Sequence, residues 1–376
     1  MTQKRLSIIG KGTAGCYGVI HFLKYTDWEI DWYYDPKIKT QPVGEGSTLD
    51  FPRDLDFLIN FNTDELEKIK GTPKAGIKKI NWGIGNTFTH TFPAGSVGYH
   101  FSAVYLQELI HATLLKEPKV RIIETNIEHD SIDSDFILDC SGAPACLDSY
   151  VKTDSIPVNS VHVTQCYWNA PRFFYTLTIA RPYGWVFGIP LLDRCSIGYM
   201  YNNNFNDLEQ IKDDTKEVLK ELNLISSDNV NSFSFKNYYK KQNYNGRVAY
   251  NGNASFFLEP LEATSINFMN QNQRRAFDYW NKYRSEENVN IDYTNEILEI
   301  EKVIMLHYAA GSIYDTDFWK FAKEKGSKSI EALRKDDKFN WYIMRNPFDP
   351  MFVYGTWNTR SWLLNLKELG IYDKLR

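Results

Sequence analysis

A glycine-rich turn close to the N-terminus constrains the fold of this chain more than any other feature. The apolar run 5–9 predicts a buried strand that ends at Gly10, and residues 14–24 carry apolar side chains at helical spacing. A second strand is predicted at 29–34 and is followed by Asp35. Together these form a βαβ unit, which favours a parallel sheet with a nucleotide at the carboxyl ends of its strands.

The turn itself, 10–15, has the sequence GKGTAG and so matches the spacing GxGxxG. The first glycine permits a tight turn, the second lets a pyrophosphate approach the backbone, and the third lets the helix pack on the strand. The helix N-terminus faces the phosphates, and an acid about 20 residues further on accepts a ribose hydroxyl. The predicted dinucleotide-binding residues are therefore Gly10, Gly12, Thr13, Ala14, Gly15 and Asp35.

Composition and charge exclude several other classes of protein. The 376 residues carry a net charge of −4, which offers no basic surface for a phosphate backbone. The five cysteines include no CxxC pair, so neither a zinc site nor a disulfide framework is indicated. We find no signal-peptide pattern and no run of about 18 apolar residues. We therefore expect a cytoplasmic protein with no metal site and with neither nucleic acid nor a membrane as partner.

The share of aromatic residues, 15%, is high. It fits core and subunit-contact packing, and it also fits an aromatic-lined site for a planar substrate. Composition does not choose between these two interpretations.

Two later segments favour FAD as the dinucleotide. Residues 135–142 (DFILDCSG) resemble the strand and turn that flavin monooxygenase folds place against their cofactor, and 252–254 (GNA) resembles their Gly-Asp-Ala segment. Asn253 replaces the usual Asp, which keeps a hydrogen-bonding group and loses a charge. The resemblance implies that Asp139, Gly142 and Asn253 contact FAD.

The rest of the chain fits such a fold. Residues 158–201 predict three or four strands rich in Val, Tyr, Phe and Thr, and helical periodicity dominates after Thr264. The expected fold class is mixed α/β, with an FAD-binding Rossmann-like parallel sheet of the flavin monooxygenase type, an antiparallel sheet over the flavin, and a helical C-terminal part. We expect one unit, 1–376, with the FAD-binding part at about 1–150 and 245–275, the antiparallel sheet and substrate part at about 155–244, and the helical part at about 276–376.

Three motifs carry a closer resemblance. Residues 184–191 (GWVFGIPL) resemble G-W-x-W-x-I-P-L, 72–77 (TPKAGI) resembles a segment with an essential lysine, and 257–266 (FLEPLEATSI) resembles E-P-L-E-S-T-G. In these motifs the sequence is similar to the flavin-dependent halogenases of the tryptophan halogenase type. The resemblance implies that Trp185 and Phe187, which replaces the second Trp, separate the flavin from the substrate. A buried strand with ordinary aromatic packing is the alternative.

By the same resemblance, Lys74 is the essential lysine. In a desolvated aromatic pocket it loses its proton more readily, and it handles hypohalous acid either as a hydrogen-bond donor or as a haloamine. Glu262 matches the acid that lies near this lysine and accepts the ring proton or positions the halogenating species. An N-capping role for Glu262 is the alternative. Thr264 and Ser265, at a predicted helix start, match the halide-binding pair.

Two weaker similarities complete the predicted site. Residues 43–48 (VGEGST) resemble a V-G-E-A-T turn beside the flavin, which implies that Gly44, Glu45 and Ser47 contact the cofactor; a plain turn is the alternative. His90 and Phe92 stand where substrate-lining residues occur in the family. A lone histidine, however, is more often a structural residue.

The resemblance implies an enzyme that takes FADH2 from a separate flavin reductase and uses O2 and chloride, bromide or iodide to form hypohalous acid. Lys74 would deliver the halogen to an electron-rich aromatic substrate. Tryptophan halogenases are distinctly longer, so we expect a phenol, an indole or a similar ring rather than free tryptophan. A flavin-dependent monooxygenase, and a flavin-binding sensor or inactive homologue, remain as alternatives. The aromatic residues outside the motifs favour a homo-oligomer.

Overall fold

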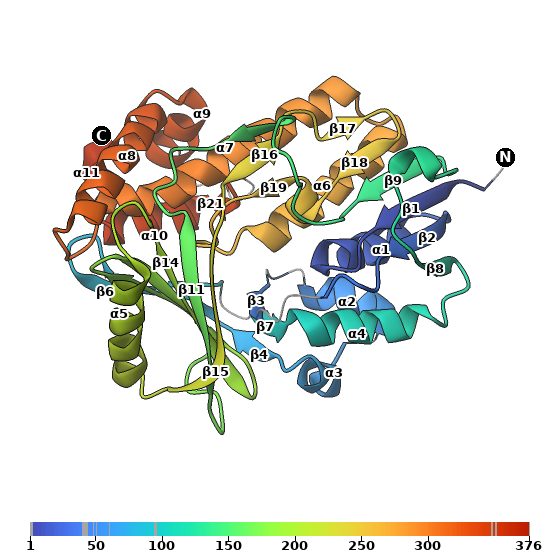
Figure 1. Cartoon of the computed structure of the whole chain (residues 1–376). Coiled ribbons are helices and arrows are strands. Elements are labelled where there is room, and N and C mark those ends of the chain that lie inside the picture. The colour runs from blue at the N-terminus through green and yellow to red at the C-terminus, as the bar shows by residue number, and fades with distance from the viewer. Residues whose placement is uncertain are drawn as a thin grey trace.

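The computed structural model describes residues 3–39, 44–47, 49, 51–59, 61–93, 96–346, 349 and 352–375. Two large sheets form its two halves, one mostly parallel and the other mostly antiparallel (Figure 1). Helices α6 (Ser265–Trp280), α7 (Glu286–Ala310) and α8 (Asp317–Arg334) run along the top of this view and join the halves. The mixed α/β fold and the helical C-terminal part predicted from the sequence are confirmed.

Six of the described strands form the sheet that contains the glycine-rich unit. Strand β1 (Arg5–Ile9) pairs in parallel with β2 (Glu29–Tyr34) and with β9 (Phe136–Asp139), and α1 (Thr13–Tyr25) connects β1 to β2. The predicted βαβ unit is therefore confirmed. The strand order is β17-β18-β9-β1-β2-β8, with β8 at Val120–Glu124, β17 at Tyr244–Asn245 and β18 at Val248–Tyr250.

Seven of the described strands form the larger sheet, in the order β15-β11-β14-β13-β12-β5-β6. The block predicted at 158–201 contributes four strands that pair antiparallel with their neighbours in that block. The bounds are β5 (Gly76–Trp82), β6 (Asn86–Thr91), β11 (Ser160–Tyr167), β12 (Thr176–Arg181), β13 (Gly184–Pro190), β14 (Arg194–Tyr201) and β15 (Ile225–Ser234).

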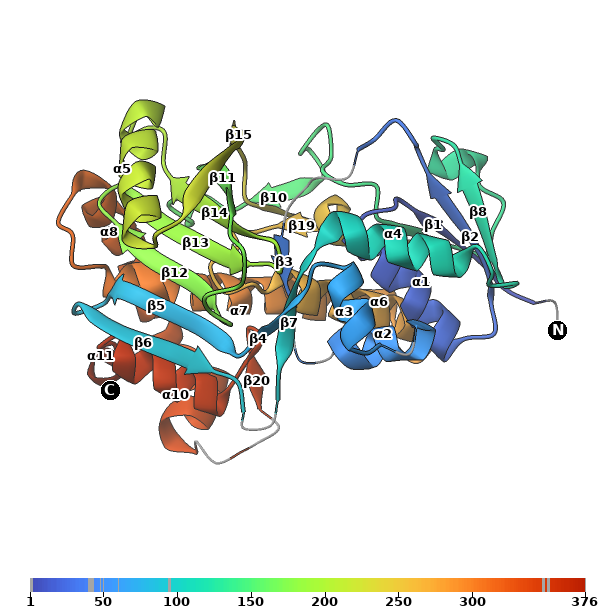
Figure 2. The same ribbon diagram turned by 90° about the horizontal axis from the view of Figure 1, so that it is seen from below.

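This sheet differs from the prediction in one respect. Strand β5 pairs in parallel with β12, with Ile77 opposite Thr176, so the sheet is not wholly antiparallel. Strands β5 and β6 thus join the larger sheet, whereas the sequence grouped 76–91 with the FAD-binding part. Figure 2 shows both strands at the edge of the sheet, with α10 (Thr359–Glu368) beside β6.

Smaller sheets and helices connect these halves. The sheet β3-β7-β4 lies between them (Figure 2). The small strands are β3 (Gly44–Gly46), β4 (Thr72–Lys74), β7 (Gly98–Ser102), β10 (Tyr150–Lys152), β16 (Tyr238–Lys240), β19 (Phe256–Phe257), β20 (Val353–Tyr354) and β21 (Trp357–Asn358). The other α-helices are α2 (Phe51–Ile59), α3 (Thr63–Lys68), α4 (Ala103–Leu114), α5 (Leu208–Glu221), α9 (Asp337–Phe339) and α11 (Tyr372–Leu375).

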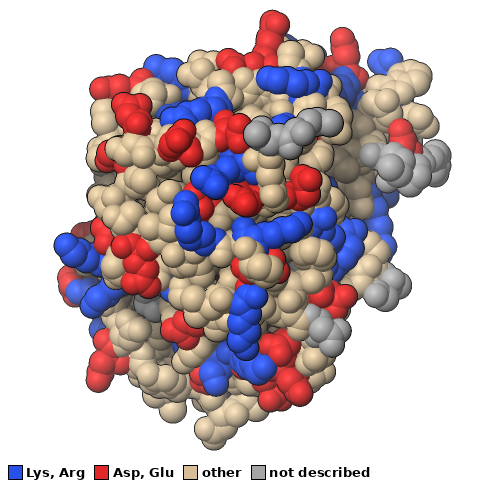
Figure 3. Space-filling view, turned by 90° about the vertical axis from the view of Figure 1, so that its right-hand side faces the viewer, with Lys and Arg blue, Asp and Glu red and all other residues tan. Residues whose placement is uncertain are grey.

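On the face seen in Figure 3, basic and acidic side chains are interspersed. None of the helices in the described ranges has the length and apolar character needed to cross a membrane.

Helix α7 lies in the main hydrophobic core, where Ile300 and Val303 are fully buried. Helix α8 approaches it closely at Gly326, since a Cβ placed there would lie 2.3 Å from the backbone nitrogen of Ala309. The two helices can therefore pack at this distance only if residue 326 has no side chain.

We predict that Gly326→Ala lowers the free energy of unfolding by about 1–3 kcal/mol, because the added methyl group forces the helices apart. This loss outweighs the gain in helix propensity, which is about 1 kcal/mol for replacing glycine by alanine. Chemical denaturation measures the effect. The control is Ser327→Ala at the neighbouring exposed position, which should change stability by less than about 0.5 kcal/mol. Equal stability of Gly326→Ala and the wild type would contradict the close approach.

Candidate functional site

The glycine-rich turn follows β1 directly. Gly10 has a φ of +105° in the left-handed region, and its backbone nitrogen donates to the carbonyl oxygen of Tyr33 (2.7 Å). A Cβ at Gly10 would lie 2.2 Å from the carbonyl oxygen of Cys140, and one at Gly15 would lie 2.0 Å from that of Gly10. Both glycines are therefore required for packing within the protein.

Gly12 differs from its two neighbours in the motif. Its backbone is extended, with a φ of −66°, and no described atom lies within 4 Å of a Cβ placed there. The open space in front of it lies at the N-terminus of α1, where unpaired backbone N–H groups favour an anion. This is the arrangement that a pyrophosphate requires.

Two other predicted segments meet the turn. The hydroxyl of Thr13 donates to Oε1 of Glu45 (2.7 Å), and burial raises the pKa of Glu45 although this hydrogen bond lowers it. A Cβ at Gly252 would lie 2.6 Å from the Cβ of Ala14. The structure therefore brings 44–46 and 252–254 to the turn. Asn253 is exposed, and its carbonyl accepts from Tyr238 (2.9 Å). Val43 and Thr48 of the predicted 43–48 turn lie outside the described residues.

Asp139 ends β9 beside the turn. It accepts from the backbone of Ser141 and from Nε2 of His129, both at 2.9 Å. Burial raises the pKa of Asp139, but these hydrogen bonds outweigh it and leave the pKa below its usual value. Gly142 has a φ of +105°, and no described atom lies within 4 Å of a Cβ placed there. Asp35, after β2, accepts from the backbone of Lys37 (2.8 Å). Sequence reasoning missed His129, which belongs to no motif.

Trp185 is fully buried on β13, with Phe187 on the same face and 6.2 Å away between ring centroids. Its indole nitrogen donates to the hydroxyl of Tyr308 on α7 (2.9 Å), which in turn donates to Oε2 of Glu259 (2.8 Å). Burial raises the pKa of Glu259 to about 8. Sequence reasoning missed Tyr308 and Glu259 as partners of Trp185, because neither lies near it in the chain.

Lys74, at the end of β4, is buried. Its Nζ donates to the carbonyl oxygen of Ser47 (3.4 Å) and lies 5.6 Å from the centroid of the Phe92 ring. Burial lowers the pKa of Lys74 to about 8, Glu262 opposes this change, and Lys79 adds to it. The structure therefore brings together three predicted residues, Lys74, Ser47 and Phe92, around a desolvated amine.

Glu262 is buried in a cluster that the sequence revealed only in part. Its Oε1 lies 2.7 Å from Nζ of Lys79 on β5 and 3.0 Å from Nε2 of His307 on α7. Its Oε2 lies 3.9 Å from Nδ1 of the predicted His90 on β6. The N-cap of α6 is Thr264, so the N-capping role considered for Glu262 is wrong. Lys79 lies two residues after the buried Ile77 and so shares its face of β5. This spacing was the one feature of the sequence that could have indicated the burial of Lys79.

His90 is held from the other side as well. Its Nε2 lies 2.8 Å from the hydroxyl of Ser361 on α10, and its ring meets that of Trp357 edge-on at 5.4 Å. Burial lowers the pKa of His90. The predicted substrate-lining residues are therefore divided, with His90 beside Glu262 and Phe92 beside Lys74.

The predicted halide pair begins α6. Thr264 is buried, and its side chain makes no capping hydrogen bond to the helix among the described groups. Ser265 is half-buried, and Ala263 before it has a φ of +51°, which turns the chain sharply into the helix. The first backbone N–H groups of a 16-residue helix can hold an anion at this point.

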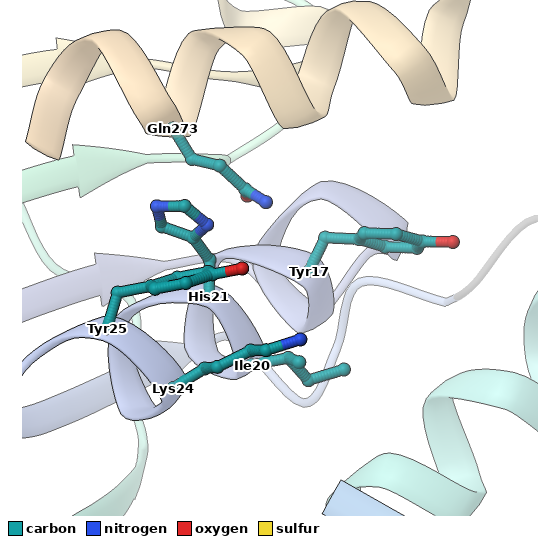
Figure 4. A pocket seen from close by; sticks show the side chains of 6 residues that line it. All are labelled: Tyr17, Ile20, His21, Lys24, Tyr25 and Gln273. Carbon is teal, nitrogen blue, oxygen red and sulfur yellow. The ribbon is translucent and has the colours of Figure 1, made fainter. Parts of the chain in front are cut away.

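A small pocket lies outside this site, between α1 and α6 (Figure 4). It is lined by His21 and Gln273 among others, and burial lowers the pKa of His21 to about 3, so the imidazole stays neutral. This pocket contains none of the predicted site residues.

Comparison with known proteins indicates the same family as the sequence motifs. The family model for tryptophan halogenase matches residues 107–357. Tryptophan 6-halogenase SttH of Streptomyces toxytricini is 21% identical over 286 residues, which cover 68% of this chain and 54% of that protein. Tryptophan 7-halogenase RebH of Lentzea aerocolonigenes is 22% identical over 326 residues, 73% of this chain and 59% of that protein. The matched region is thus little more than half the length of these relatives.

Solved structures show the same fold. Xcc4156, a flavin-dependent halogenase from Xanthomonas campestris, superposes with a TM-score of 0.79 at 20% identity, covering 98% of this chain and 89% of that one. BrvH, a flavin-dependent halogenase from Brevundimonas sp. BAL3, also gives a TM-score of 0.79, at 19% identity and with 98% and 90% covered.

We predict that Gly12→Ala and Gly15→Ala fail in different ways. Gly15→Ala should lower stability by about 1–3 kcal/mol, because its methyl group collides with the backbone of Gly10. Gly12→Ala should fold with wild-type stability and weaken FAD binding about tenfold or more, because its methyl group fills the space left for the cofactor. Thermal unfolding and flavin titration measure the two effects. Wild-type affinity for FAD in Gly12→Ala would rule out the pyrophosphate position.

Proposed function

The chain belongs to the tryptophan halogenase family, and we propose that it is an FADH2-dependent halogenase that acts on an electron-rich aromatic molecule with O2 and a halide. One observation carries the proposal. A buried carboxylate, Glu262, lies close enough to the buried amine of Lys74 to raise the pKa of that amine against the effect of burial. An enzyme that merely hydroxylated its substrate at the flavin would have no use for this pair.

The residues at the end of the parallel sheet fit FAD. The open space at Gly12 and Gly142 suits the pyrophosphate and an adjoining part of the cofactor, and the exposed amide of Asn253 suits its ribityl hydroxyls. Asp35, Glu45 and Asp139 would add polar contacts. When bound, the reduced flavin supplies two electrons and the halide two more for the reduction of O2, which yields hypohalous acid and water.

Support for a halide site comes from the start of α6. The helix N-terminus presents N–H donors, and the hydroxyl of Thr264 is not used for capping the helix. Trp185, held by Tyr308 and Glu259, would stand with Phe187 between this site and the organic substrate, so that hypohalous acid but not the substrate crosses.

Lys74 would act on the hypohalous acid. As an ammonium it donates a hydrogen bond that polarises the bond between oxygen and halogen, and as an amine it forms a haloamine. In either form the fixed position of Nζ decides which ring carbon meets the halogen. The hydroxide released from hypohalous acid takes a proton from the nitrogen of Lys74 and leaves as water, and the substituted ring carbon loses its proton to the carboxylate of Glu262, which returns it to Lys74.

We propose a phenol, an indole or a similar ring as substrate rather than free tryptophan, because the matched region is much shorter than the tryptophan halogenases compared. A separate flavin reductase would supply FADH2. We further propose a cytoplasmic location and a homo-oligomeric state, and we keep the division into an FAD-binding part, a sheet and substrate part and a helical part.

We predict halogenated products when the protein is incubated with FAD, a flavin reductase, NADH, a panel of phenols and indoles, and chloride, bromide or iodide in turn. Lys74→Ala should reduce product on the order of 100-fold or more and leave FAD binding intact. The matched control is Lys78→Ala, because Lys78 lies on the opposite face of β5 from the buried cluster and is half-buried.

Mass spectrometry of the products decides the outcome. No halogen in any product, with any halide across the panel, would overturn the proposed function. Product that persists in Lys74→Ala would show that free hypohalous acid escapes and that the lysine does not direct it.

We also predict an inflection near pH 8 in the rate of product formation, because burial lowers the pKa of Lys74 to about 8. The rate rises through this pH if the amine forms a haloamine and falls if the ammonium donates a hydrogen bond. The lowered pKa of Lys74 in the folded protein also makes the free energy of unfolding rise between about pH 8 and 10.5, because the unfolded chain binds more protons than the folded one in this range. Lys74→Met should reduce that rise in a denaturation series. A rate independent of pH in this range would contradict the prediction.

A further inference from the structure

Lys79 is a second buried lysine, and neither the motifs nor the proposed chemistry uses it. It lies in the middle of β5 with 0% of its surface exposed. Its Nζ lies 5.6 Å from the centroid of the Phe88 ring, 5.9 Å from that of Trp357, and 2.7 Å from Oε1 of Glu262. A buried ammonium with aromatic neighbours is costly unless a carboxylate compensates it. The position of Lys79 is therefore linked to that of Glu262.

The ring of His307 adds a second constraint on the same oxygen. Its Nδ1 lies 3.1 Å from the carbonyl oxygen of Val303, which can only accept, so Nδ1 carries a hydrogen. Its Nε2 lies 3.0 Å from Oε1 of Glu262, so the second ring nitrogen faces this oxygen. Oε1 of Glu262 thus lies within 3.0 Å of two basic nitrogens, those of Lys79 and His307.

The other oxygen of Glu262 is in a different environment. Oε2 faces Nδ1 of His90 at 3.9 Å, which is beyond hydrogen-bond length, while Nε2 of His90 pairs with Ser361. The two oxygens of Glu262 are therefore not equivalent, since Oε1 lies within 3.0 Å of two basic nitrogens whereas Oε2 faces His90 at 3.9 Å.

We propose that Lys79 is the positioning residue for Glu262: it holds Oε1, keeps the carboxyl group ionised, and leaves Oε2 to accept the proton from the substituted ring. This inference rests on the proposed halogenase function. Lys79 touches neither the substrate nor the halogen in this scheme. It acts through Glu262. The residue that removes the ring proton, Glu262, is therefore distinct from the residue that delivers the halogen, Lys74.

The electrostatics of the cluster agree with this geometry. Burial alone would raise the pKa of Glu262, but Lys79 first and His307 second bring it well below its usual value. The groups that face Glu262 are Lys79, His307 and His90, and burial lowers the pKa of each of them. Without Lys79, burial would dominate and Glu262 would hold a proton at higher pH.

The test compares Lys79→Met, which keeps most of the length of the side chain and removes its charge, with Lys79→Arg and with Lys78→Met as matched control. We expect Lys79→Met to lower kcat about tenfold or more, to move the acidic limb of the kcat profile to higher pH by about one unit or more, and to leave FAD binding unchanged. Lys79→Arg should restore the position of the limb, and Lys78→Met should behave as the wild type. An unmoved acidic limb in Lys79→Met would overturn the proposal.

A double variant keeps the proposal testable if Lys79→Met folds poorly. Lys79→Met combined with Glu262→Gln removes both charges and should therefore fold. Its kcat should equal that of Glu262→Gln alone, because Lys79 acts only through the carboxylate. The proposal would be overturned if kcat of the double variant fell below that of Glu262→Gln by the same factor by which Lys79→Met lowers kcat of the wild type. Such a result would show that Lys79 acts independently of Glu262.

A readout without activity separates this inference from the proposed function. Infrared difference spectra between the wild type and Glu262→Gln report the ionisation of Glu262 as pH falls. The carboxyl group should stay ionised to a lower pH in the wild type than in the Lys79→Met background. Equal titration in both would overturn the positioning role. If no halogenated product forms but the titration shifts as expected, the proposed function fails and the ionic control of Glu262 by Lys79 stands.

Discussion

Glu262 is a buried carboxylate that holds together parts of the chain far apart in sequence. It precedes α6, and its oxygens face Lys79 on β5, His307 on α7 and His90 on β6. A charge buried in this way is tolerated only while its partners are in place, since loss of one leaves the others uncompensated. The cluster therefore fixes how the larger sheet, α7 and the start of α6 lie relative to one another, and with them the residues around Lys74 and Trp185.

Glu259 is a second buried acid in the same short segment, and its environment has the opposite effect. It accepts from Tyr308 and Trp185, and burial raises its pKa to about 8, so it holds a proton at neutral pH. The segment thus carries one neutral acid, Glu259, and one ionised acid, Glu262. Their protonation differs because Glu259 has hydroxyl and indole partners whereas Glu262 faces basic groups. The neutral acid ties β13 to α7 through Trp185 and Tyr308. The ionised acid is the one that the proposed mechanism uses for proton transfer.

The sequence predicted the elements whose pattern is local. The turn at Gly10, the four strands in 158–201 and the helices after Thr264 each follow from spacing along a short stretch, and the structure has them. The parallel pairing of β5 with β12 could not be predicted in this way, because it depends on which distant strand offers a free edge. Lys79 was missed for a related reason: a lysine in a strand is usually exposed, and its counter-ion stands in another segment. Tyr308 and His129 likewise acquire their partners only through the tertiary fold.

The two buried lysines show how environment, rather than residue type, decides what an amine can do. Nζ of Lys74 donates to a backbone carbonyl and lies over the ring of Phe92, but burial outweighs these contacts and lowers the pKa of Lys74 to about 8. Lys79 is buried to the same degree, yet it has a carboxylate at 2.7 Å that favours its charged form. A proton therefore leaves Lys74 more readily than it would leave a lysine paired with an acid, which suits a group that exchanges protons with hypohalous acid. Glu262, whose Oε1 lies 2.7 Å from Lys79, opposes the lowering of the pKa of Lys74 only in part, and burial dominates. In the proposed mechanism, the pairing of Lys79 with Glu262 thus supports both an amine that can change its charge and a carboxylate that keeps its own.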